Sequence, residues 1–329
     1  ERRIGTAAEF DESAWSEATV LFLAERLENR RDPRSPYGLV PRVIPPLEES
    51  EPAGFADVFL PGGKDPGESW RSLRARTGAD TIGRSERVQM IFDAGELTTA
   101  YPHVRVSGGA GARLRLTYAE ALRLPWNTPG AQLLGRPQSL ANLASHYADE
   151  TTAWTFDRRG EISGWADIWE PAGRPEGESF VPLHWRTFRY VGLTIETADE
   201  PLVLEALQHR FTAYPYRVEA KFRCDDARLE NIWRVGLRTM RLCAHETFED
   251  CPYYEQMQYA GDTMITSKLG MLTTGDARLS RQALYQFDWS RLPGGVTQSR
   301  YPSRLVQVIP SWSLHWITSI HDYTWFSGD

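Results

Sequence analysis

The sequence predicts a mixed fold, in which an antiparallel β-sandwich is followed by a set of α-helices. Three observations carry this prediction. Up to about residue 223 apolar residues recur with a period of two, which is typical of strands with one buried face. From Asp225 onward the period is 3.6, the period of an α-helix. At 329 residues, the chain is also longer than one hydrophobic core usually supports, so we expect more than one domain.

Residues 1–90 are the least regular part of the sequence. Several prolines interrupt any pattern there, so we expect a loop-rich connecting segment with some strands. The prolines on which this expectation depends are Pro33, Pro36, Pro41, Pro45 and Pro46. We expect the β-sandwich to occupy residues 91–223 and the helices to occupy residues 224–329.

Within the predicted sandwich, residues 113–118 alternate between apolar and polar side chains. A glycine-rich run, residues 107–111, comes just before them, and Val104 and Val106 alternate before that. This order predicts a β-hairpin closed by a glycine-rich turn. Residues 191–195 and 216–222 also alternate and predict two further half-buried strands.

Four helices are expected in the last third of the chain. The first has an apolar stripe from Leu229 to Met240 and can be capped by Asp225 or Asp226. The second carries Ile265, Leu269 and Leu272 and stops near Gly275, and Asp276 can cap a third with Leu279, Ala283 and Phe287. A loop over residues 292–310 precedes a fourth helix over residues 311–326. These helices lack a closing partner, so we expect the sequence to be a segment of a longer protein.

Composition excludes several classes of function. The net charge of −7 argues against a nucleic-acid-binding protein. No apolar run approaches the roughly 18 residues that a membrane span needs, so we expect no membrane partner. The three cysteines, Cys224, Cys243 and Cys251, match no zinc signature or disulfide framework. We expect no metal and no organic cofactor, because phosphate-binding and dinucleotide-binding motifs are also lacking.

Carboxylates and aromatic residues are concentrated in residues 245–263, at a junction between two helices. Pro252 suits the first turn of a helix. A helix from Pro252 would place Glu255, Tyr259 and Asp262 on one face, a composition unsuited to a core. The alternative is a solvated helix face with Asp250 as its cap.

The aromatic residues in this region favour a chemical role. A carboxyl group beside Tyr253 and Tyr254 is partly desolvated, which raises its pKa and favours a general acid. Neighbouring carboxylates that stay ionised raise that pKa further and accept hydrogen bonds from hydroxyl groups. An acid, hydroxyl-binding acids and aromatic rings together are typical of a glycoside hydrolase subsite.

The sequence resembles the bacterial α-L-rhamnosidases of glycoside hydrolase family 78. Residues 250–256, Asp-Cys-Pro-Tyr-Tyr-Glu-Gln, followed by Gly-Asp-Thr at residues 261–263, are similar to the family's active-site signature. Four other stretches agree with the supporting β-domain or the catalytic barrel of that family. They are residues 92–99, 185–190, 297–304 and 309–314.

The resemblance implies a β-sandwich packed against an (α/α)6 barrel, of which residues 224–329 are the incomplete N-terminal part. It implies an exo-acting enzyme that hydrolyses terminal α-L-rhamnosides with inversion. By motif position Glu255 matches the general acid, and Asp250 and Asp262 match the acids that hold the sugar hydroxyls. An apolar wall for the methyl group of the deoxy sugar would come from Trp312 or Tyr301, although Trp312 also fits plain helix packing.

Other polar residues of the region have simpler explanations. Arg304 and His321 are candidates for the mouth of the barrel, but ordinary salt-bridge or packing roles are favoured for each. Glu246 and Glu249 are rival acids whose place before the motif favours capping or surface roles. Met264 stands where family members often carry arginine.

The resemblance also places the general base far along the barrel, beyond residue 329, so the chain alone is expected to be inactive. Two alternatives stay open: another (α/α)6 glycosidase acting on a different terminal deoxy or acidic sugar, and a non-catalytic carbohydrate-binding protein. The expected partner is a rhamnose-containing glycoside or oligosaccharide. A homodimer and a calcium ion in the β-domain are left open. A bacterial cytoplasmic location is favoured over secretion.

Overall fold

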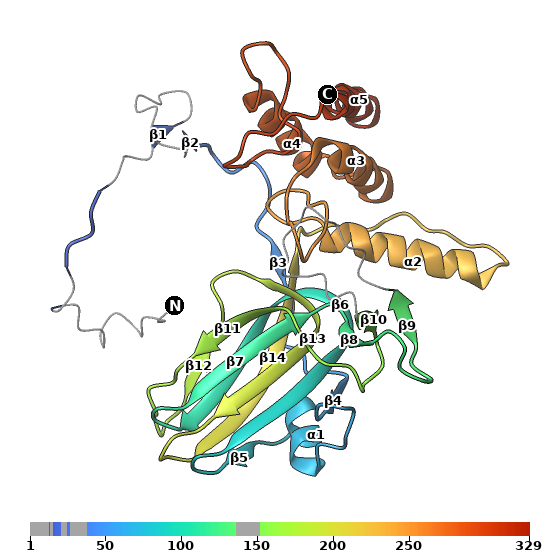
Figure 1. Ribbon diagram of the computed structural model, residues 1–329. Coiled ribbons are helices and arrows are strands. Elements are labelled where there is room, and N and C mark those ends of the chain that lie inside the picture. The colour runs from blue at the N-terminus through green and yellow to red at the C-terminus, as the bar shows by residue number, and fades with distance from the viewer. Residues whose placement is uncertain (1–12, 14–15, 21–24, 27–37, 136–151) are drawn as a thin grey trace. The chain divides into compact units, whose positions relative to one another are not determined.

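The computed structural model describes the chain except for residues 1–12, 14–15, 21–24, 27–37 and 136–151 (Figure 1). The chain divides into two compact units. The first, here called the sheet unit, is built from residues 49–212, and the second, the helical unit, from residues 213–329 with part of 4–48. The boundary at residue 90, where the proline-interrupted stretch ends, and the boundary at residue 223, where the hydrophobic period changes, stay predictions. Pro33 and Pro36 lie outside the described residues.

The sheet unit is built on one nine-stranded sheet with antiparallel strand pairs. The strand order is β11-β7-β13-β6-β14-β3, with β12 and β4 also paired to β6 and β5 paired to β14. The strands are β3 (Glu48–Glu49), β4 (Asp57–Phe59), β5 (Asp80–Ile82), β6 (Arg87–Gly108), β7 (Arg113–Ala119), β11 (Trp165–Trp169), β12 (Glu178–Phe180), β13 (Arg186–Glu196) and β14 (Leu202–Ala213).

The long strand β6 joins two groups of strands. Its first half pairs with β13 and β4, and its second half pairs with β14 and β12. The prediction of antiparallel β structure followed by helices is confirmed. Both groups belong to one hydrogen-bonded sheet, because β6 pairs with strands of each.

Short segments of the central strands are buried on both faces. Met90, Ile91 and Phe92 are buried one after another on β6, and so are residues 190–193 on β13. Helix α1 (Glu68–Arg74) contributes buried Trp70, whose ring centroid lies 6.3 Å from that of Phe92. The predicted alternation holds in the second half of β13, where Leu193 and Ile195 are buried, Thr194 is half-buried and Glu196 is exposed. A run of consecutive buried residues requires cover on both sides.

Two of the stretches that carry the family resemblance lie side by side. Residues 92–99 are on β6, and residues 185–190 open β13. Their register shifts where Arg189 lies between Phe188 and Tyr190. There the Arg189 Nε donates to Asp93 Oδ1 at 3.0 Å, and the Gly95 N–H donates to the same oxygen at 2.7 Å. An ion pair thus fixes the irregular part of the β6–β13 ladder.

Two sequence-based strand predictions are wrong. Residues 104–106 and 113–118 do form strands, but not a hairpin with each other: Val104 lies opposite Leu207 of β14, whereas Leu116 lies opposite Leu193 of β13. The glycine-rich turn therefore connects β6 to β7, and β13 lies between these two strands in the sheet. Residues 216–222 form no strand, because they extend past the end of β14 and their Glu219 and Ala220 N–H groups share one acceptor, the carbonyl of Thr273.

Two smaller sheets complete the β structure. β8 (Leu122–Pro125), β10 (Thr152–Thr155) and β9 (Leu133–Gly135) form an antiparallel sheet with β10 in the middle. β1 (Glu25–Arg26) pairs with β2 (Gly38–Leu39) in parallel.

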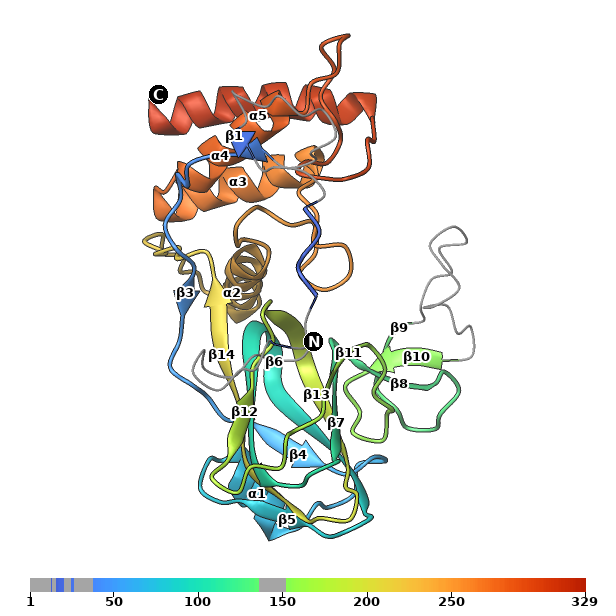
Figure 2. The same cartoon turned by 90° about the vertical axis from the view of Figure 1, so that its left-hand side faces the viewer.

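The helical unit contains the four predicted helices. They are α2 (Ala227–Leu242), α3 (Ala260–Thr274), α4 (Arg278–Trp289) and α5 (Pro310–Ser327). Asp226 caps α2 by accepting from the Arg228 N–H at 2.9 Å, and α3 ends at Gly275 in the left-handed conformation. Helices α3, α4 and α5 pack against one another (Figure 2). Among the described residues, no helix combines the length and the apolarity needed to cross a membrane.

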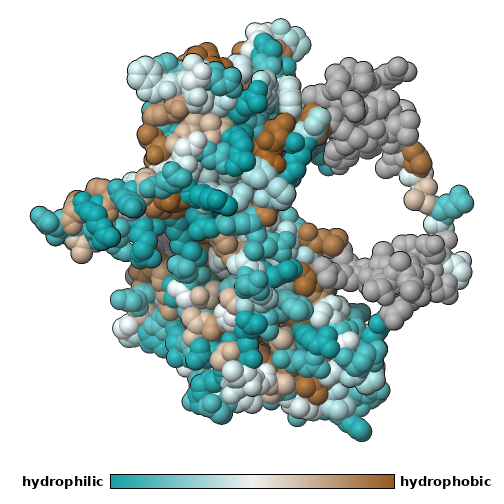
Figure 3. Space-filling view, turned by 180° about the vertical axis from the view of Figure 1, so that it is seen from behind, coloured by the Kyte–Doolittle hydropathy of each residue, from teal (hydrophilic) through white to brown (hydrophobic). Residues whose placement is uncertain are grey.

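Burial in the helical unit follows only part of the predicted pattern. The stripe of α4, Leu279, Ala283 and Phe287, is buried as predicted. The stripes of α2 and α3 are largely exposed: Ile232 is 65% exposed and Ile265 is 58% exposed. Part of this exposed hydrophobic surface is visible in brown in Figure 3. The buried positions of α3 are mainly small residues, which lets α5 and Tyr216 approach closely.

Candidate active site

The acid-rich segment forms a compact loop between α2 and α3, not the predicted helix from Pro252. Residues 252–255 form a turn, and α3 begins only at Ala260. Gln256 has a φ of 53°, in the left-handed region, which ends any helix at that point. The loop returns on itself, because the Met257 N–H donates to Asp250 Oδ1 at 2.9 Å and the Asp250 N–H donates to the Met257 carbonyl at 3.0 Å.

Glu255 lies at the end of this turn. Its N–H donates to the Cys251 Sγ at 3.3 Å, and its Oε2 accepts a hydrogen bond of 2.8 Å from the Tyr259 hydroxyl. Glu255 and Tyr259 are therefore close to each other as predicted, but through a turn and not on one face of a helix. The carboxyl group of Glu255 is not desolvated as predicted, because Glu255 is exposed.

Tyr259 connects Glu255 to an arginine that sequence reasoning did not single out. Arg300 Nη1 donates to the Tyr259 hydroxyl at 3.0 Å, and its guanidinium carbon lies 5.7 Å from the centre of the Tyr259 ring. Burial raises the pKa of Tyr259, and its hydrogen bond to Glu255 adds to this rise. The only signal for Arg300 was its place within residues 297–304, one of the stretches that resemble the family.

The two predicted hydroxyl-binding acids belong to the same cluster. Asp262 lies in the first turn of α3. Partial burial raises the pKa of Asp262, and the negative charges of Asp250 and Glu255 raise it further, while His315 opposes them. Since both charges act on Asp262, we call Asp250, Glu255 and Asp262 the acidic cluster.

Of the two predicted aromatic residues, Trp312 lies beside the residue that precedes Asp262. Trp312, on α5, packs its indole ring against Gly261, so closely that a Cβ added at Gly261 would lie 2.9 Å from the ring. The indole Nε1 is buried and has no hydrogen-bond partner among the described residues. Tyr301 is held by its backbone: its N–H donates to the Gln258 carbonyl at 3.1 Å, and the Gln258 side chain donates to its carbonyl at 2.8 Å.

The other candidates have separate surroundings. Glu246 forms an exposed salt bridge of 2.6 Å with Arg42, as a surface role requires. Glu249 is buried, which contradicts its expected capping or surface role. Its Oε1 lies 3.1 Å from His245 Nδ1, and burial raises its pKa. Arg304 is exposed, and His321 is an exposed neighbour of Asp322.

Among the described residues, no group of three or more His, Cys, Asp or Glu side chains is arranged to hold a metal ion. All three cysteines are free thiols, and Cys243 is buried.

Comparison with known proteins places this cluster in a family context. Residues 217–329 match the model of the bacterial alpha-L-rhamnosidase 6 hairpin glycosidase domain, and the acidic cluster lies inside that match. Residues 217–329 are thus similar to that domain, and the fold of the chain is similar to that of solved rhamnosidases, one of them of glycoside hydrolase family 78. A search of curated proteins gave no match.

Three solved structures illustrate the similarity of this rhamnosidase-like chain. A family 78 rhamnosidase of Bacillus sp. GL1 matches with 22% identity and a TM-score of 0.57 over 77% of this chain and 24% of the other. A Klebsiella oxytoca rhamnosidase with rhamnose bound matches with 17% identity and a TM-score of 0.63 over 87% and 54%. A Streptomyces avermitilis α-L-rhamnosidase complexed with L-rhamnose matches with 16% identity and a TM-score of 0.55 over 88% and 25%. This chain therefore spans from about a quarter to about half of the length of these proteins.

Proposed function

We propose that the rhamnosidase-like chain carries the acid-bearing part of the active site of an exo-acting α-L-rhamnosidase. In this proposal Glu255 is the general acid of an inverting reaction. It protonates the glycosidic oxygen as the bond from that oxygen to the sugar carbon breaks. Water attacks the opposite face of the sugar, and a second carboxylate takes its proton. The base is assigned to no residue of this chain.

The environment of Glu255 is the observation that supports this role. One carboxyl oxygen, Oε2, is held by the Tyr259 hydroxyl at 2.8 Å. The other, Oε1, has no hydrogen-bond partner among the described residues and is open to a ligand. An acid catalyst needs this arrangement, because the carboxyl group must be oriented while one oxygen stays available for the proton that it donates.

Asp250 and Asp262 suit the recognition of sugar hydroxyls. Carboxylates accept two hydrogen bonds or more each and bind vicinal hydroxyl groups well. Trp312 and Tyr301 would supply the apolar wall for the methyl group at C6. The buried indole edge of Trp312 beside Gly261 supports this placement, since it brings an aromatic ring next to Asp262.

We infer that α2 to α5 are the first helices of an (α/α)6 barrel. The family domain matched by residues 217–329 is named for six hairpins. The exposed apolar residues of α2 and α3 support the inference, because further helices would cover such faces.

The Glu255→Gln variant of the full-length protein tests the proposal. With an aryl α-L-rhamnoside that has a poor leaving group, kcat should fall by about 10²- to 10⁴-fold, whereas binding of L-rhamnose should persist. With 2,4-dinitrophenyl α-L-rhamnoside the loss should be much smaller, because that leaving group departs without protonation. Glu246→Gln is the matched control, since it removes an exposed carboxylate from the same region.

Three results would contradict the proposal. Survival of the rate in Glu255→Gln removes the residue from the acid role. Cleavage of a different aryl glycoside, with the rhamnoside left intact, favours an (α/α)6 glycosidase that acts on a different terminal sugar. Sugar binding by a wild-type protein that hydrolyses none of the panel favours a non-catalytic carbohydrate-binding protein.

A further inference from the structure

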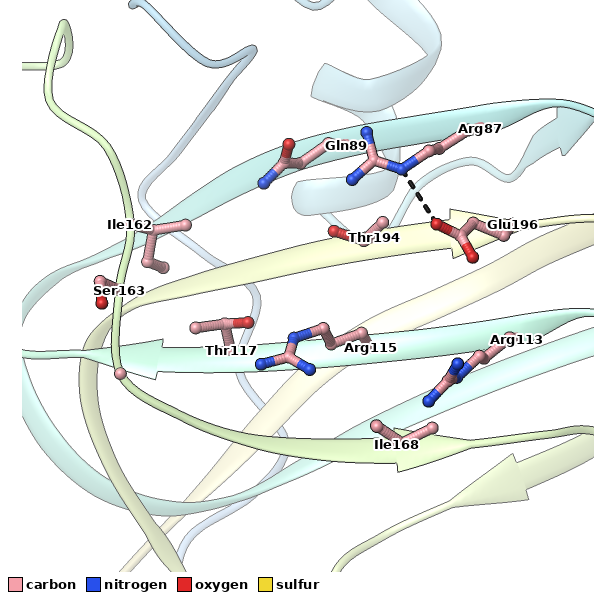
Figure 4. Close-up of a pocket in the computed structure, with 11 residues that line it drawn as sticks. Arg87, Gln89, Arg113, Arg115, Thr117, Ile162, Ser163, Ile168, Thr194 and Glu196 are labelled. Carbon is pink, nitrogen blue, oxygen red and sulfur yellow. Dashed lines mark hydrogen bonds and ion pairs between the residues drawn. The ribbon is translucent and has the colours of Figure 1, made fainter. Parts of the chain in front are cut away.

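The sheet unit contains a pocket of about 410 Å³ that is separate from the acidic cluster. Its floor is one face of three neighbouring strands, β6, β13 and β7, and the segment around Ile162 borders it (Figure 4). None of the residues that resemble the family's active-site signature line it. Its residues therefore need an explanation of their own.

Strand register places the polar residues of this pocket in two parallel rows. Glu196 of β13 lies opposite Arg87 of β6 on one side and opposite Arg113 of β7 on the other. Two residues along each strand, the second row holds Gln89, Thr194 and Arg115, with Thr194 again opposite the other two. Because residues two apart in a strand share a face, all of these side chains stand on the same side of the sheet (Figure 4).

The pocket is positively charged within a negatively charged chain. Three arginines and one glutamate line it, whereas the chain as a whole carries a net charge of −7. Arg87 is paired with Glu196 at 3.0 Å. Arg113 and Arg115 are exposed and form no ion pair with any described residue. Two guanidinium groups on one strand are therefore available to an anion.

The rest of the pocket offers neutral polar and apolar contacts. Gln89, Thr117 and Thr194 can donate and accept hydrogen bonds. Gly192 leaves room in the middle strand for Ile162, whose side chain would lie 2.9 Å from a Cβ added at Gly192. Ile168 lines the pocket from β11, opposite Arg115.

We propose that this pocket binds a carboxylate-bearing sugar of the uronic acid class. The guanidinium groups of Arg113 and Arg115 bind the carboxylate, for which a planar fork of donors is suited. Thr117, Thr194 and Gln89 bind ring hydroxyls, and Ile162 contacts the carbon face of the ring. The choice of a sugar over other carboxylates rests on the proposed function as a glycosidase.

Calorimetric titration of the full chain tests the site without reference to hydrolysis. The probes are trigalacturonate and its methyl ester, which keeps the hydroxyl groups and loses the charge. The wild-type protein should bind the acid, and it should bind the ester at least tenfold more weakly. Arg113→Gln combined with Arg115→Gln should weaken binding of the acid by about 10- to 100-fold.

Two further variants make the test specific. Arg217→Gln combined with Arg223→Gln removes the same charge from two exposed arginines of the helical unit and should leave the affinity unchanged. Arg115→Lys keeps the charge but loses the planar fork, and should weaken binding by several fold. Circular dichroism confirms that each variant is folded.

Several outcomes would overturn the proposal. One is a lack of trigalacturonate binding by the wild-type protein, and another is equal binding of the acid and its ester. Equal affinity for inorganic phosphate would identify a simple anion site, and tighter binding of triglutamate would identify a peptide site. Because the readout is binding at the sheet unit, loss of rhamnoside hydrolysis in Glu255→Gln neither supports nor removes it.

Discussion

The Tyr259 hydroxyl donates a 2.8 Å hydrogen bond to Oε2 of Glu255 across a turn. Arg300 in turn donates to the same hydroxyl at 3.0 Å. A donor that itself accepts from a cation is polarised, so the bond that it gives is strengthened. The chain Arg300–Tyr259–Glu255 therefore orients the carboxyl group without occupying its second oxygen.

Tyr259→Phe should separate orientation from chemistry. The change removes the hydroxyl that holds Glu255, so we expect kcat toward an aryl rhamnoside to fall by about tenfold, with little change in KM. Steady-state kinetics of the full-length protein measures both constants. Tyr285→Phe removes a hydroxyl from an exposed tyrosine of α4 and should leave kcat unchanged. An equal loss in both variants would show that the hydroxyl of Tyr259 has no special role.

Asp250→Asn should lower the pKa of Asp262. The pKa of Asp262 is raised mainly by burial, and next by the charge of Asp250 and then of Glu255. Replacing a nearby anion with a neutral amide makes ionisation of Asp262 easier, so its titration should move to lower pH. Carboxyl carbon NMR measures the shift directly, without any substrate. Glu246→Gln should leave the titration in place, and an unchanged Asp262 in Asp250→Asn would show that the two acids are not coupled.

Features that depend on local sequence were predicted well. The cap at Asp226, the end of α3 at Gly275 and the buried stripe of α4 each depend on a few neighbouring residues. The strand β14 was missed, although it runs from Leu202 to Ala213. Its register shifts between Leu204 and Ala206, and this irregularity breaks the alternation on which the prediction depended.

Features that depend on distant partners were predicted poorly. The hairpin failed because β13, about 80 residues further along the chain, occupies the place beside β7. The prediction of a helix from Pro252 was wrong because Gln256 adopts a positive φ, and no pattern in the sequence predicted this conformation. The acidic cluster was nevertheless located by its motif. Arg300 was not, since its contact with Tyr259 joins segments 41 residues apart.

Two glycine-to-alanine changes should have opposite effects on stability. A Cβ at Gly261 would meet the Trp312 ring at 2.9 Å, so the half-buried ring must move. The expected cost is about 1–2 kcal/mol, together with weaker rhamnose binding if Trp312 contacts the sugar. A Cβ at Gly236 of α2 meets nothing within 4 Å, so Gly236→Ala should stabilise the helix by up to about 1 kcal/mol.

Urea unfolding followed by far-ultraviolet circular dichroism measures the change in the free energy of unfolding for both variants. Rhamnose affinity, measured on the folded variants, separates the effect of the ring from that of the fold. Stabilisation by Gly261→Ala would mean that the Trp312 ring yields freely, and would weaken its assignment as a wall of the sugar site.

Glu120, which directly follows β7, should make the stability of the sheet unit dependent on pH. Burial alone raises its pKa from 4.5 to about 7. The folded state favours the protonated form of Glu120. The free energy of unfolding is therefore highest below about pH 4.5, and this advantage is lost as the pH rises through 7. Relative to Glu120→Gln, which cannot ionise, the wild-type protein should lose about 2–3 kcal/mol across this range. Urea unfolding at several pH values measures the difference, and Glu161→Gln, at an exposed position, should show none. A constant difference between the wild type and Glu120→Gln from pH 4 to 8 would show that Glu120 ionises freely in the folded protein.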